Sequence, residues 1–388
     1  MSDHAAVTAK GARRWAAGHP WIYRSDVTRR PASPAGAVLV SDPRRRPLGW
    51  ALWSPASEIS LRLLDTNPDA SIDDAWWKDR LARSIARRAH LADEATAYRL
   101  VHAEADGCPS LVVDRYDRWL VVQLLSAGIE RYRGAIVAAL GDLVSPSGIL
   151  ARNDAAVRTK ERLARETVLL AGDVPREIEI VEYGLRYLAA PWEGQKTGAF
   201  LDQRENRALV GRLARGRALD CFSYHGSFAL HLARGADRVT AVDTSEPALT
   251  RARENATRNA LTNIDFVQAD VFDYLRDAES RGERFDTIVL DPPAFAKTRA
   301  ALAGALRGYK DINLRAMRLL APGGSLFTAS CSFHLTRPLF LEMLEHAAAD
   351  SGRRLALRTV CGQAVDHPEV LTIPETGYLK GAVVEALA

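Results

Sequence analysis

The stretch RALDCFSYHGSFALHLARGADRVTAVD, residues 217–243, contains two short apolar segments on either side of a helical one. The segments at 217–222 and 238–243 have the composition of buried strands, and residues 226–235 predict a helix between them. A helix that separates two strands is the usual crossover between parallel strands. The stretch therefore predicts an α/β fold, in which ligands bind at the carboxyl ends of the strands.

The same alternation of strand and helix continues to the end of the chain. Further strands are predicted at 264–270, 285–293, 324–332, 354–360 and 378–387, with helices between most of them. Their apolar runs are nearly continuous, as expected of strands that are buried on both faces. Residues 183–388 are therefore predicted to form a doubly wound parallel sheet with helices on both sides.

Two other regions precede this domain. Residues 1–70 contain short β-like runs between turns rich in proline and glycine, which predicts a small β-rich domain. Residues 71–182 combine helical stretches with hairpin signals, including a turn near Asp117 and a hairpin at 177–191, which predicts an α+β domain. A length of 388 residues agrees with two or three domains.

Composition and charge narrow the class of protein. No apolar run reaches the roughly 18 residues that span a bilayer, and the N-terminus does not resemble a signal peptide, so a cytoplasmic location is expected. The four cysteines are widely spaced, so neither a disulfide framework nor a bound metal is expected. Residues 1–70 contain 10 Lys or Arg and 6 Asp or Glu, whereas the remainder contains 42 of each. This basic excess indicates either a polyanion partner or an ordinary solvated surface.

The first three strand ends suit a nucleoside cofactor. Asp220 precedes a loop that reaches Gly226 at the start of a helix, but the other glycines of a dinucleotide fingerprint are missing, which disfavours a dehydrogenase. Asp243 ends the second strand, where an acid typically binds ribose hydroxyls. Asp270 ends the third strand and could accept a bond from an adenine amino group or cap the following turn.

The fourth strand ends in the rigid segment LDPPAF, residues 290–295. Two prolines fix the backbone and remove two N–H groups, so the segment would present Asp291 and the carbonyls of Pro292 and Pro293 to the cleft. Phe295 could stack on a flat ligand. The alternative is a simple turn after a strand.

The fifth strand ends at Cys331, in FTASCSFHL, residues 327–335. A cysteine at this tip could be a nucleophile that neighbouring cations activate, or a small apolar residue in the core. Cys221 is expected in the core, and Cys108 and Cys361 are expected away from the cleft. His334 could assist this cysteine or cap the following helix; the cap is the favoured role, and the choice stays open.

The segment WEGQKTGAFLDQRENR, residues 192–207, is unusually polar for a connection into the first strand. Arg204 could bind a carboxylate bidentately, and Gln195 and Lys196 could face a substrate. Read from the residues alone, the segment could equally be a surface loop.

In this order, Asp220, Gly226, Asp243, Asp270, DPPAF and TASCS resemble a class I S-adenosylmethionine-dependent methyltransferase with a Rossmann-like domain. GQKTGAFLDQREN resembles, more specifically, the PUA-domain-containing ribosomal RNA large-subunit methyltransferase I family, which makes 5-methylcytosine in 23S rRNA. KGARRWAAGHPWIYRSDV resembles the N-terminal PUA domain of that family, and HAEADGCPSLVVDRYDRWLVVQ resembles its central domain. The resemblance covers the whole chain and implies boundaries at 1–70, 71–182 and 183–388.

The resemblance also implies roles for the residues and partners for the protein. Arg204 and the loop from Asp220 through Phe222 to Gly226 would hold the methionine end of S-adenosylmethionine, Asp243 its ribose and Asp270 its adenine. Cys331 would be the nucleophile that adds to the cytosine. RNA is the implied partner, with no membrane or DNA, and a homodimer is compatible with the sequence.

Two departures from the family patterns are visible. Cys108-Pro109-Ser110 stands where the family usually has Leu-Pro-Gly, which affects only a local turn. Many RNA cytosine methyltransferases carry a second cysteine after the fourth-strand proline, where this chain has Pro293-Ala294. Two rival functions stay open: methylation of an exocyclic amino group, which DPPAF also resembles, and an RNA-binding assembly factor with an idle methyltransferase domain.

Overall fold

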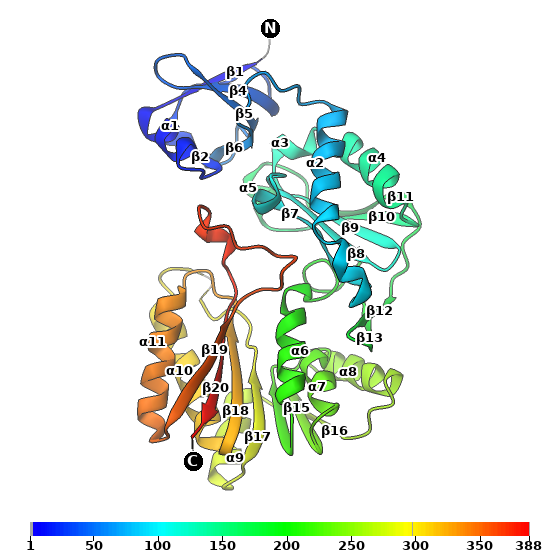
Figure 1. Cartoon of the computed structure of the whole chain (residues 1–388), viewed down its shortest axis with the longest axis vertical. Coiled ribbons are helices and arrows are strands. Elements are labelled where there is room, and N and C mark those ends of the chain that lie inside the picture. Colours follow the sequence, from blue (N-terminus) through cyan, green and yellow to red (C-terminus); the bar gives the residue numbers. More distant parts are fainter. Residues whose placement is uncertain (1–2, 297, 388) are drawn as a thin grey trace. The chain divides into compact units, whose positions relative to one another are not determined.

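The computed structural model describes residues 3–296 and 298–387 and divides the chain into two compact units (Figure 1). Unit 1 contains Met1–Val181, Ala189–Leu201 and Val365–Thr376. Unit 2 contains Glu182–Leu188, Asp202–Ala364 and Gly377–Ala388. Each unit is therefore built from segments that are distant in the sequence. In the described part of the chain, every helix is too short or too polar to cross a membrane.

Unit 1 contains a six-stranded sheet close to the N-terminus, in the order β2-β6-β5-β4-β1-β3. Its buried side chains alternate along the strands, as in β4, where Val38 and Val40 enter the core and Ala37 and Leu39 do not. Trp15 of a short helix packs on this core. The elements are β1 (His4–Val7), α1 (Ala9–Ala16), β2 (Trp21–Tyr23), β3 (Val27–Arg29), β4 (Gly36–Ser41), β5 (Pro47–Trp53) and β6 (Ile59–Asp65).

A five-stranded sheet, β11-β10-β9-β8-β7, forms the second part of unit 1. Trp77 of α2 and Ile136 of α4 are buried in its core. Asp117 has a left-handed φ of 55° between β8 and β9, which confirms the predicted hairpin turn. The elements are α2 (Asp74–Ala86), β7 (Ala97–His102), β8 (Leu111–Tyr116), β9 (Trp119–Leu124), α3 (Ala127–Glu130), α4 (Arg133–Val144), β10 (Gly148–Asn153), α5 (Val157–Lys160) and β11 (Glu166–Gly172).

The predicted hairpin at 177–191 is also present, as β12 (Ile178–Glu182) and β13 (Leu185–Ala189). Gly184 lies between these two strands with a φ of 80°, a conformation that glycine adopts without steric cost. The chain passes from unit 1 to unit 2 within this hairpin.

Unit 2 is a seven-stranded sheet in the order β16-β15-β14-β17-β18-β20-β19. The first five strands are parallel, as predicted, and β20 lies antiparallel between β18 and β19. The expectation of a fully parallel sheet is therefore wrong for the C-terminal strand. Between β19 and β20 the described chain has only a short 3₁₀ helix, Pro374–Thr376, and no α-helix, and a connection without a crossover α-helix favours antiparallel return. The strands are β14 (Arg217–Cys221), β15 (Arg238–Asp243), β16 (Ile264–Gln268), β17 (Phe285–Leu290), β18 (Leu320–Ser330), β19 (Leu355–Cys361) and β20 (Lys380–Ala386).

Both faces of this sheet are covered by helices (Figure 1). In β17, Ile288 and Leu290 enter the core that α9, α10 and α11 share, whereas Val289 enters the core on the side of α6 and α7. Successive side chains point to opposite faces of a strand, so an uninterrupted apolar run supplies both cores. The helices are α6 (Arg204–Leu213), α7 (Ser227–Ala233), α8 (Glu246–Arg258), α9 (Val271–Ser280), α10 (Leu302–Leu319) and α11 (Arg337–Ser351).

Unit 2 contains a buried ion pair between Glu182 of β12 and Arg207 of α6. Arg207 donates from Nε to Oε1 of Glu182 at 2.7 Å and from Nη2 to Oε2, and His231 Nε2 lies 3.1 Å from Oε1. Burial raises the pKa of Glu182, but the charge and hydrogen bonds of Arg207 outweigh burial and lower the pKa to about 2. The ionised carboxylate is therefore the form that the folded chain selects.

We expect Glu182→Gln to destabilise unit 2 by about 3–5 kcal/mol near neutral pH, because Arg207 would lose its charged partner in a buried site. Thermal unfolding followed by circular dichroism measures the loss. The folded pKa lies below the unfolded value of 4.5, so this stabilisation is present above pH 4.5 and disappears between pH 4.5 and about 2. The exposed pair of Glu246 and Arg253 supplies the control, since Glu246→Gln should change stability by at most about 0.5 kcal/mol. Equal effects of the two variants would contradict the prediction.

Candidate active site

The carboxyl ends of five parallel strands meet at one edge of the unit 2 sheet. The ladders pair Cys221 with Val242 and with Leu290, and pair Leu290 with Thr328. These registers bring together residues that are more than a hundred positions apart in sequence. The predicted residues at or just after these strand ends are Asp220, Asp243, Asp270, Asp291 and Cys331.

Asp220 is buried in β14, where its Oδ2 accepts a hydrogen bond from Ala229 N at 3.0 Å and the nearby Ser223 hydroxyl lowers its pKa. Among the described residues, nothing hydrogen-bonds to its other oxygen, Oδ1, which is also buried. Burial raises the pKa of Asp220 to about 8, and the negative charges of Asp291 and Asp243 act in the same direction. A buried carboxylate with an unsatisfied oxygen suits a cationic ligand group, such as the ammonium of a bound amino acid.

The loop after Asp220 has a strained backbone. Phe222, Tyr224 and Gly226 all have left-handed φ values, of 62°, 49° and 77°. A Cβ on Gly226 would lie 3.0 Å from Ala252 Cβ, so glycine fits here for steric as well as conformational reasons. Strain of this kind is concentrated at ligand sites in folded proteins. The loop follows β14 directly, and its contact with a cofactor stays a prediction.

The two other acids differ in how they are held. Asp243 is half-buried and accepts hydrogen bonds from Tyr224 N and from Ser245 N, both at 2.9 Å. Each of its oxygens retains capacity for another donor, so a ribose diol could bind there. Asp270 is exposed and caps α9 by accepting from Phe272 N at 2.8 Å and from Asp273 N. Of the two alternatives for Asp270, the structure therefore displays the helix cap, and an adenine contact stays a prediction.

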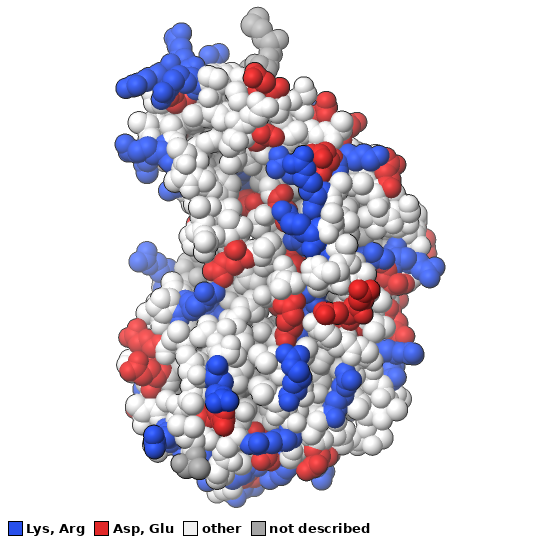
Figure 2. Space-filling view, in the orientation of Figure 1, with Lys and Arg blue, Asp and Glu red and all other residues white. Residues whose placement is uncertain are grey.

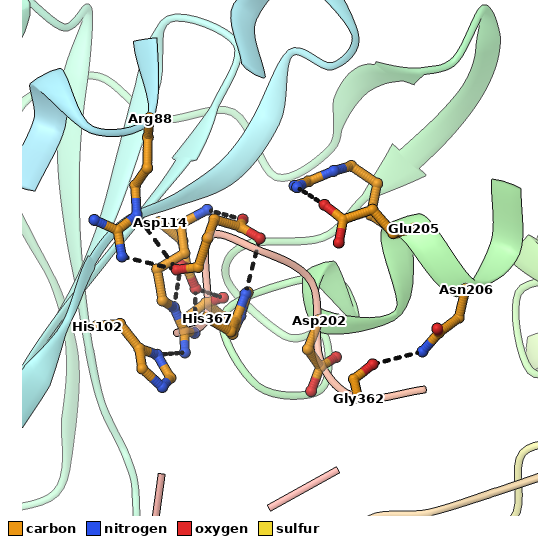
Figure 3. A network of polar contacts seen from close by, with 12 residues as sticks. Arg88, His102, Asp114, Asp202, Glu205, Asn206, Gly362 and His367 are labelled. Atoms are coloured by element: carbon orange, nitrogen blue, oxygen red, sulfur yellow. Dashed lines mark hydrogen bonds and ion pairs between the residues drawn. The ribbon is translucent and has the colours of Figure 1, made fainter. Parts of the chain in front are cut away.

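Asp291 is positioned by side chains from the start of α6. Gln203 donates from Nε2 to Asp291 Oδ1 at 2.9 Å, and Asn206 donates from Nδ2 to Gln203 Oε1 at 2.6 Å. Asn206 also bonds to the carbonyl of Gly362 at 2.9 Å, as Figure 3 shows. Sequence reasoning missed Gln203 and Asn206, although their spacing of three residues places them on one helical face.

Arg204 is fully buried at the first position of α6. Its Nη2 bonds to Oε1 of Glu205 at 2.8 Å. A guanidinium has five N–H donors, so Arg204 could also bind a ligand carboxylate in addition to Glu205. Its contact with a cofactor stays a prediction.

Cys331 follows β18 directly and is exposed, whereas Cys108 and Cys221 are buried and Cys361 is half-buried. The neighbouring residue, Ser332, is buried and fixes the turn. Its Oγ accepts from Ala296 N at 3.1 Å and lies 2.9 Å from the hydroxyl of Tyr309. The segment after β17 and the segment after β18 are thus tied together, and the thiol stands at an exposed, well-fixed position.

His334 does not cap α11, so the favoured of its two alternative roles is wrong. Thr336 occupies the N-cap, and its hydroxyl accepts from Leu339 N. A threonine is a favourable N-cap, and Pro338 in the first turn of the helix reinforces a start at this point, two residues after the histidine.

In the proline segment, Pro292 is buried and Pro293 is exposed. Phe295 is half-buried and contacts Tyr309 with ring centroids 4.5 Å apart, and it also packs near Phe222 at 6.3 Å. Packing among aromatic rings is therefore its observed environment. Stacking of Phe295 on a ligand stays a prediction.

Gln195 and Lys196 belong to unit 1, unlike the strand ends above. Lys196 has a left-handed φ of 55°, and its Nζ lies 4.7 Å from the centre of the Phe200 ring. The next residue, Thr197, is buried and donates its hydroxyl to Asp114, which Arg99 holds with two hydrogen bonds (Figure 3). The loop is therefore firmly anchored within unit 1, and its contact with substrate stays a prediction.

Comparisons with known proteins agree with this arrangement. Residues 111–360 match a family of S-adenosylmethionine-dependent methyltransferases, and residues 6–66 match a PUA-like domain. The chain is 44% identical to a ribosomal RNA large subunit methyltransferase I from Tolumonas auensis, over 95% of this chain and 96% of the relative. It is 42% identical to the protein of the same name from Escherichia coli O157:H7, over 94% of each chain.

Solved structures also share the fold. One is a provisionally assigned S-adenosylmethionine-dependent methyltransferase from Streptococcus mutans, with a TM-score of 0.83 over 98% of this chain and 99% of the other, at 21% identity. Another is a provisionally assigned methyltransferase, SMU.776, in complex with S-adenosylhomocysteine, with a TM-score of 0.85, the same coverage and 21% identity.

Proposed function

Because this chain belongs to the S-adenosylmethionine-dependent methyltransferases, in the family of the ribosomal RNA large subunit methyltransferases I, we propose that it methylates C5 of a cytosine in large-subunit ribosomal RNA. Cys331 adds to C6 of that cytosine and is released after methyl transfer. The observation that carries this proposal is the exposed thiol of Cys331 at the end of β18, next to the β17 end that holds Asp291.

The chemistry of the base explains why a thiol is needed. C5 of cytosine is a poor nucleophile, and addition of the Cys331 thiolate to C6 pushes electron density onto C5. Bound S-adenosylmethionine supplies an electrophilic methyl group to that carbon. Loss of the C5 proton and departure of the thiolate then restore the aromatic ring.

The cofactor would be held by residues that the strand ends and α6 present. The buried Oδ1 of Asp220 suits its ammonium, and Arg204 suits its carboxylate. Phe222 and Gly226 shape the loop around it, Asp243 would bind the ribose hydroxyls, and Asp270 would face the adenine amino group. This family uses S-adenosylmethionine, and the residues of this chain fit its charges.

The substrate base would enter beside the proline segment. An enzyme that acts on C5 must have the base unstacked from its neighbours. Asp291 and the carbonyls of Pro292 and Pro293 would accept hydrogen bonds from the cytosine amino group, and Phe295 would contact the base. Gln195 and Lys196 would contact the RNA around it.

The N-terminal domain supplies a basic surface for the RNA backbone. Lys and Arg side chains gather over this part of the molecule in Figure 2. The exposed arginines of this domain include two at and just after the end of β3 and three in the turn between β4 and β5, namely Arg29, Arg30, Arg44, Arg45 and Arg46. Such contacts bind phosphates without reading sequence, and they weaken as salt increases.

The nature of the methylated nucleoside tests the proposal. Purified protein is incubated with S-adenosylmethionine and a large-subunit ribosomal RNA transcript, which is then digested and analysed by tandem mass spectrometry. We expect 5-methylcytidine. An N-methylated nucleoside instead would favour the rival that acts on an exocyclic amino group. Absence of both methylation and cofactor binding, the latter measured by calorimetry, would favour an assembly factor with an idle domain.

A further inference from the structure

Lys380 lies beside the proposed nucleophile, although the two residues are far apart in sequence. It is the first residue of β20, and the antiparallel ladder pairs it with Ser330, the residue before Cys331. Lys380 is buried, whereas Cys331 is exposed. Lysine is among the residues that are least often buried, so packing alone does not explain a buried lysine next to the strand end that carries an exposed thiol.

The side chain of Lys380 bonds to the residue that follows Cys331. Its Nζ donates to the carbonyl of Ser332 at 2.7 Å and to the carbonyl of Tyr378 at 2.7 Å. Lys380 therefore contacts both neighbours of Cys331. Its backbone pairs with Ser330, and its amine donates to the carbonyl of Ser332. In the neutral amine of Lys380, the two N–H groups would donate to these two carbonyls. The lone pair of the nitrogen could then accept a proton.

The charges around Lys380 favour exchange of a proton near neutral pH. Burial lowers the pKa of Lys380 to about 8, the negative charge of Cys331 raises it, and the cation of Arg337 lowers it. Burial also raises the pKa of the nearby Tyr309, so its hydroxyl remains protonated and bonded to Ser332. Lys380 is therefore the amine at this strand end that can change its protonation state together with the thiol.

We propose that Lys380 accepts the Sγ proton of Cys331 and holds the resulting thiolate as an ammonium–thiolate pair. The S–H bond breaks, an N–H bond forms, and no further reactant is needed. Lys380 acts through Cys331 and not on the base, so it is a positioning residue. In the reaction, the same ammonium stabilises the thiolate when it leaves C6. That last role depends on the proposed function, but the pairing of amine and thiol does not.

Alkylation of Cys331 by iodoacetamide, without RNA or cofactor, tests the pair. The alkylated Cys331 peptide is quantified by mass spectrometry as a function of pH, so reaction at Cys361 does not contribute. In the unmodified chain we expect a midpoint below the value of about 8.5 for an ordinary thiol. In Lys380→Met the rate at pH 7 should fall at least tenfold, and the midpoint should move upward. Lys380→Arg keeps a cation and should stay within about threefold of the original rate.

A surface lysine provides the control. Lys310 of α10 pairs with Asp350 of α11, and Lys310→Met should leave the alkylation profile unchanged. An unchanged profile in Lys380→Met would overturn the proposal. If that variant does not fold, the unmodified chain decides, because a midpoint at or above that of an ordinary thiol also overturns it. The proposed function is tested separately. C5 methylation by a chain that lacks Cys331 would contradict the covalent mechanism but not the pairing of Lys380 with the thiol.

Discussion

Cys331→Ala is expected to lower the rate of C5 methylation by a factor on the order of 10³ or more, because loss of a covalent nucleophile removes the whole route. Without thiolate addition at C6, carbon 5 of cytosine does not attack the methyl donor at a useful rate. The measurement is single-turnover formation of 5-methylcytidine on a ribosomal RNA transcript. Affinity for S-adenosylhomocysteine should stay within about twofold, since Asp220, Asp243 and Arg204 are unchanged.

Cys361→Ala is the matched control, because Cys361 ends β19 and takes no part in the proposed reaction. It should retain the original rate. Full C5 methylation by Cys331→Ala would eliminate the covalent mechanism. If Cys331→Ala lost cofactor binding as well, the loss of activity would report a damaged fold instead of a missing nucleophile.

Asp220→Asn is expected to weaken binding of S-adenosylhomocysteine by at least about tenfold at pH 8, the loss of one charge-assisted hydrogen bond to the ligand ammonium. In the original chain the affinity should also depend on pH. The cofactor-free pKa of Asp220 is about 8, so below that pH the carboxyl must lose a proton before it can pair with a cation. Affinity should therefore rise by up to about tenfold per pH unit between about pH 6 and 8.

Calorimetry in buffers of different ionisation enthalpy measures the proton released on binding. Asp220→Asn should abolish this part of the pH dependence and leave only the titration of the ligand. The substitution should not lower the stability of the folded chain. A pKa raised above the unfolded value of 3.8 means that ionised Asp220 costs stability increasingly as pH rises towards 8. The cofactor-free variant should thus melt at or above the original temperature at pH 8. An unchanged affinity would show that the ammonium binds elsewhere.

Local sequence patterns were sufficient for most of the architecture. Continuous apolar runs, helical runs and turn residues predicted the β14–β18 strands, most of the helices between them and both hairpins, because these features depend on neighbours in the chain. The same patterns did not predict α9, whose start is marked by Asp270 as a cap, or α1 in the N-terminal region. In a parallel sheet the strand ends must share one edge, so the residues after the strands could be grouped into one site from sequence alone.

Contacts that depend on strand register could not be predicted in this way. Lys380 lies beside Cys331 only because β20 inserts antiparallel between β18 and β19, and nothing near Lys380 in the sequence indicates that order. Likewise, Gln203 reaches Asp291 only when α6 packs next to the end of β17. The cap favoured for His334 was wrong because the geometry of the helix start selected Thr336.

The sequence by itself determined which chemical groups the site contains, because strand ends and their order follow from local periodicity. The tertiary structure decided how those groups are charged and held, since burial, strand register and hydrogen-bond partners arise only when distant segments pack together. Asp220 illustrates the difference. Its place at a strand end is visible in the sequence, whereas its buried, unsatisfied oxygen and its raised pKa exist only in the folded chain.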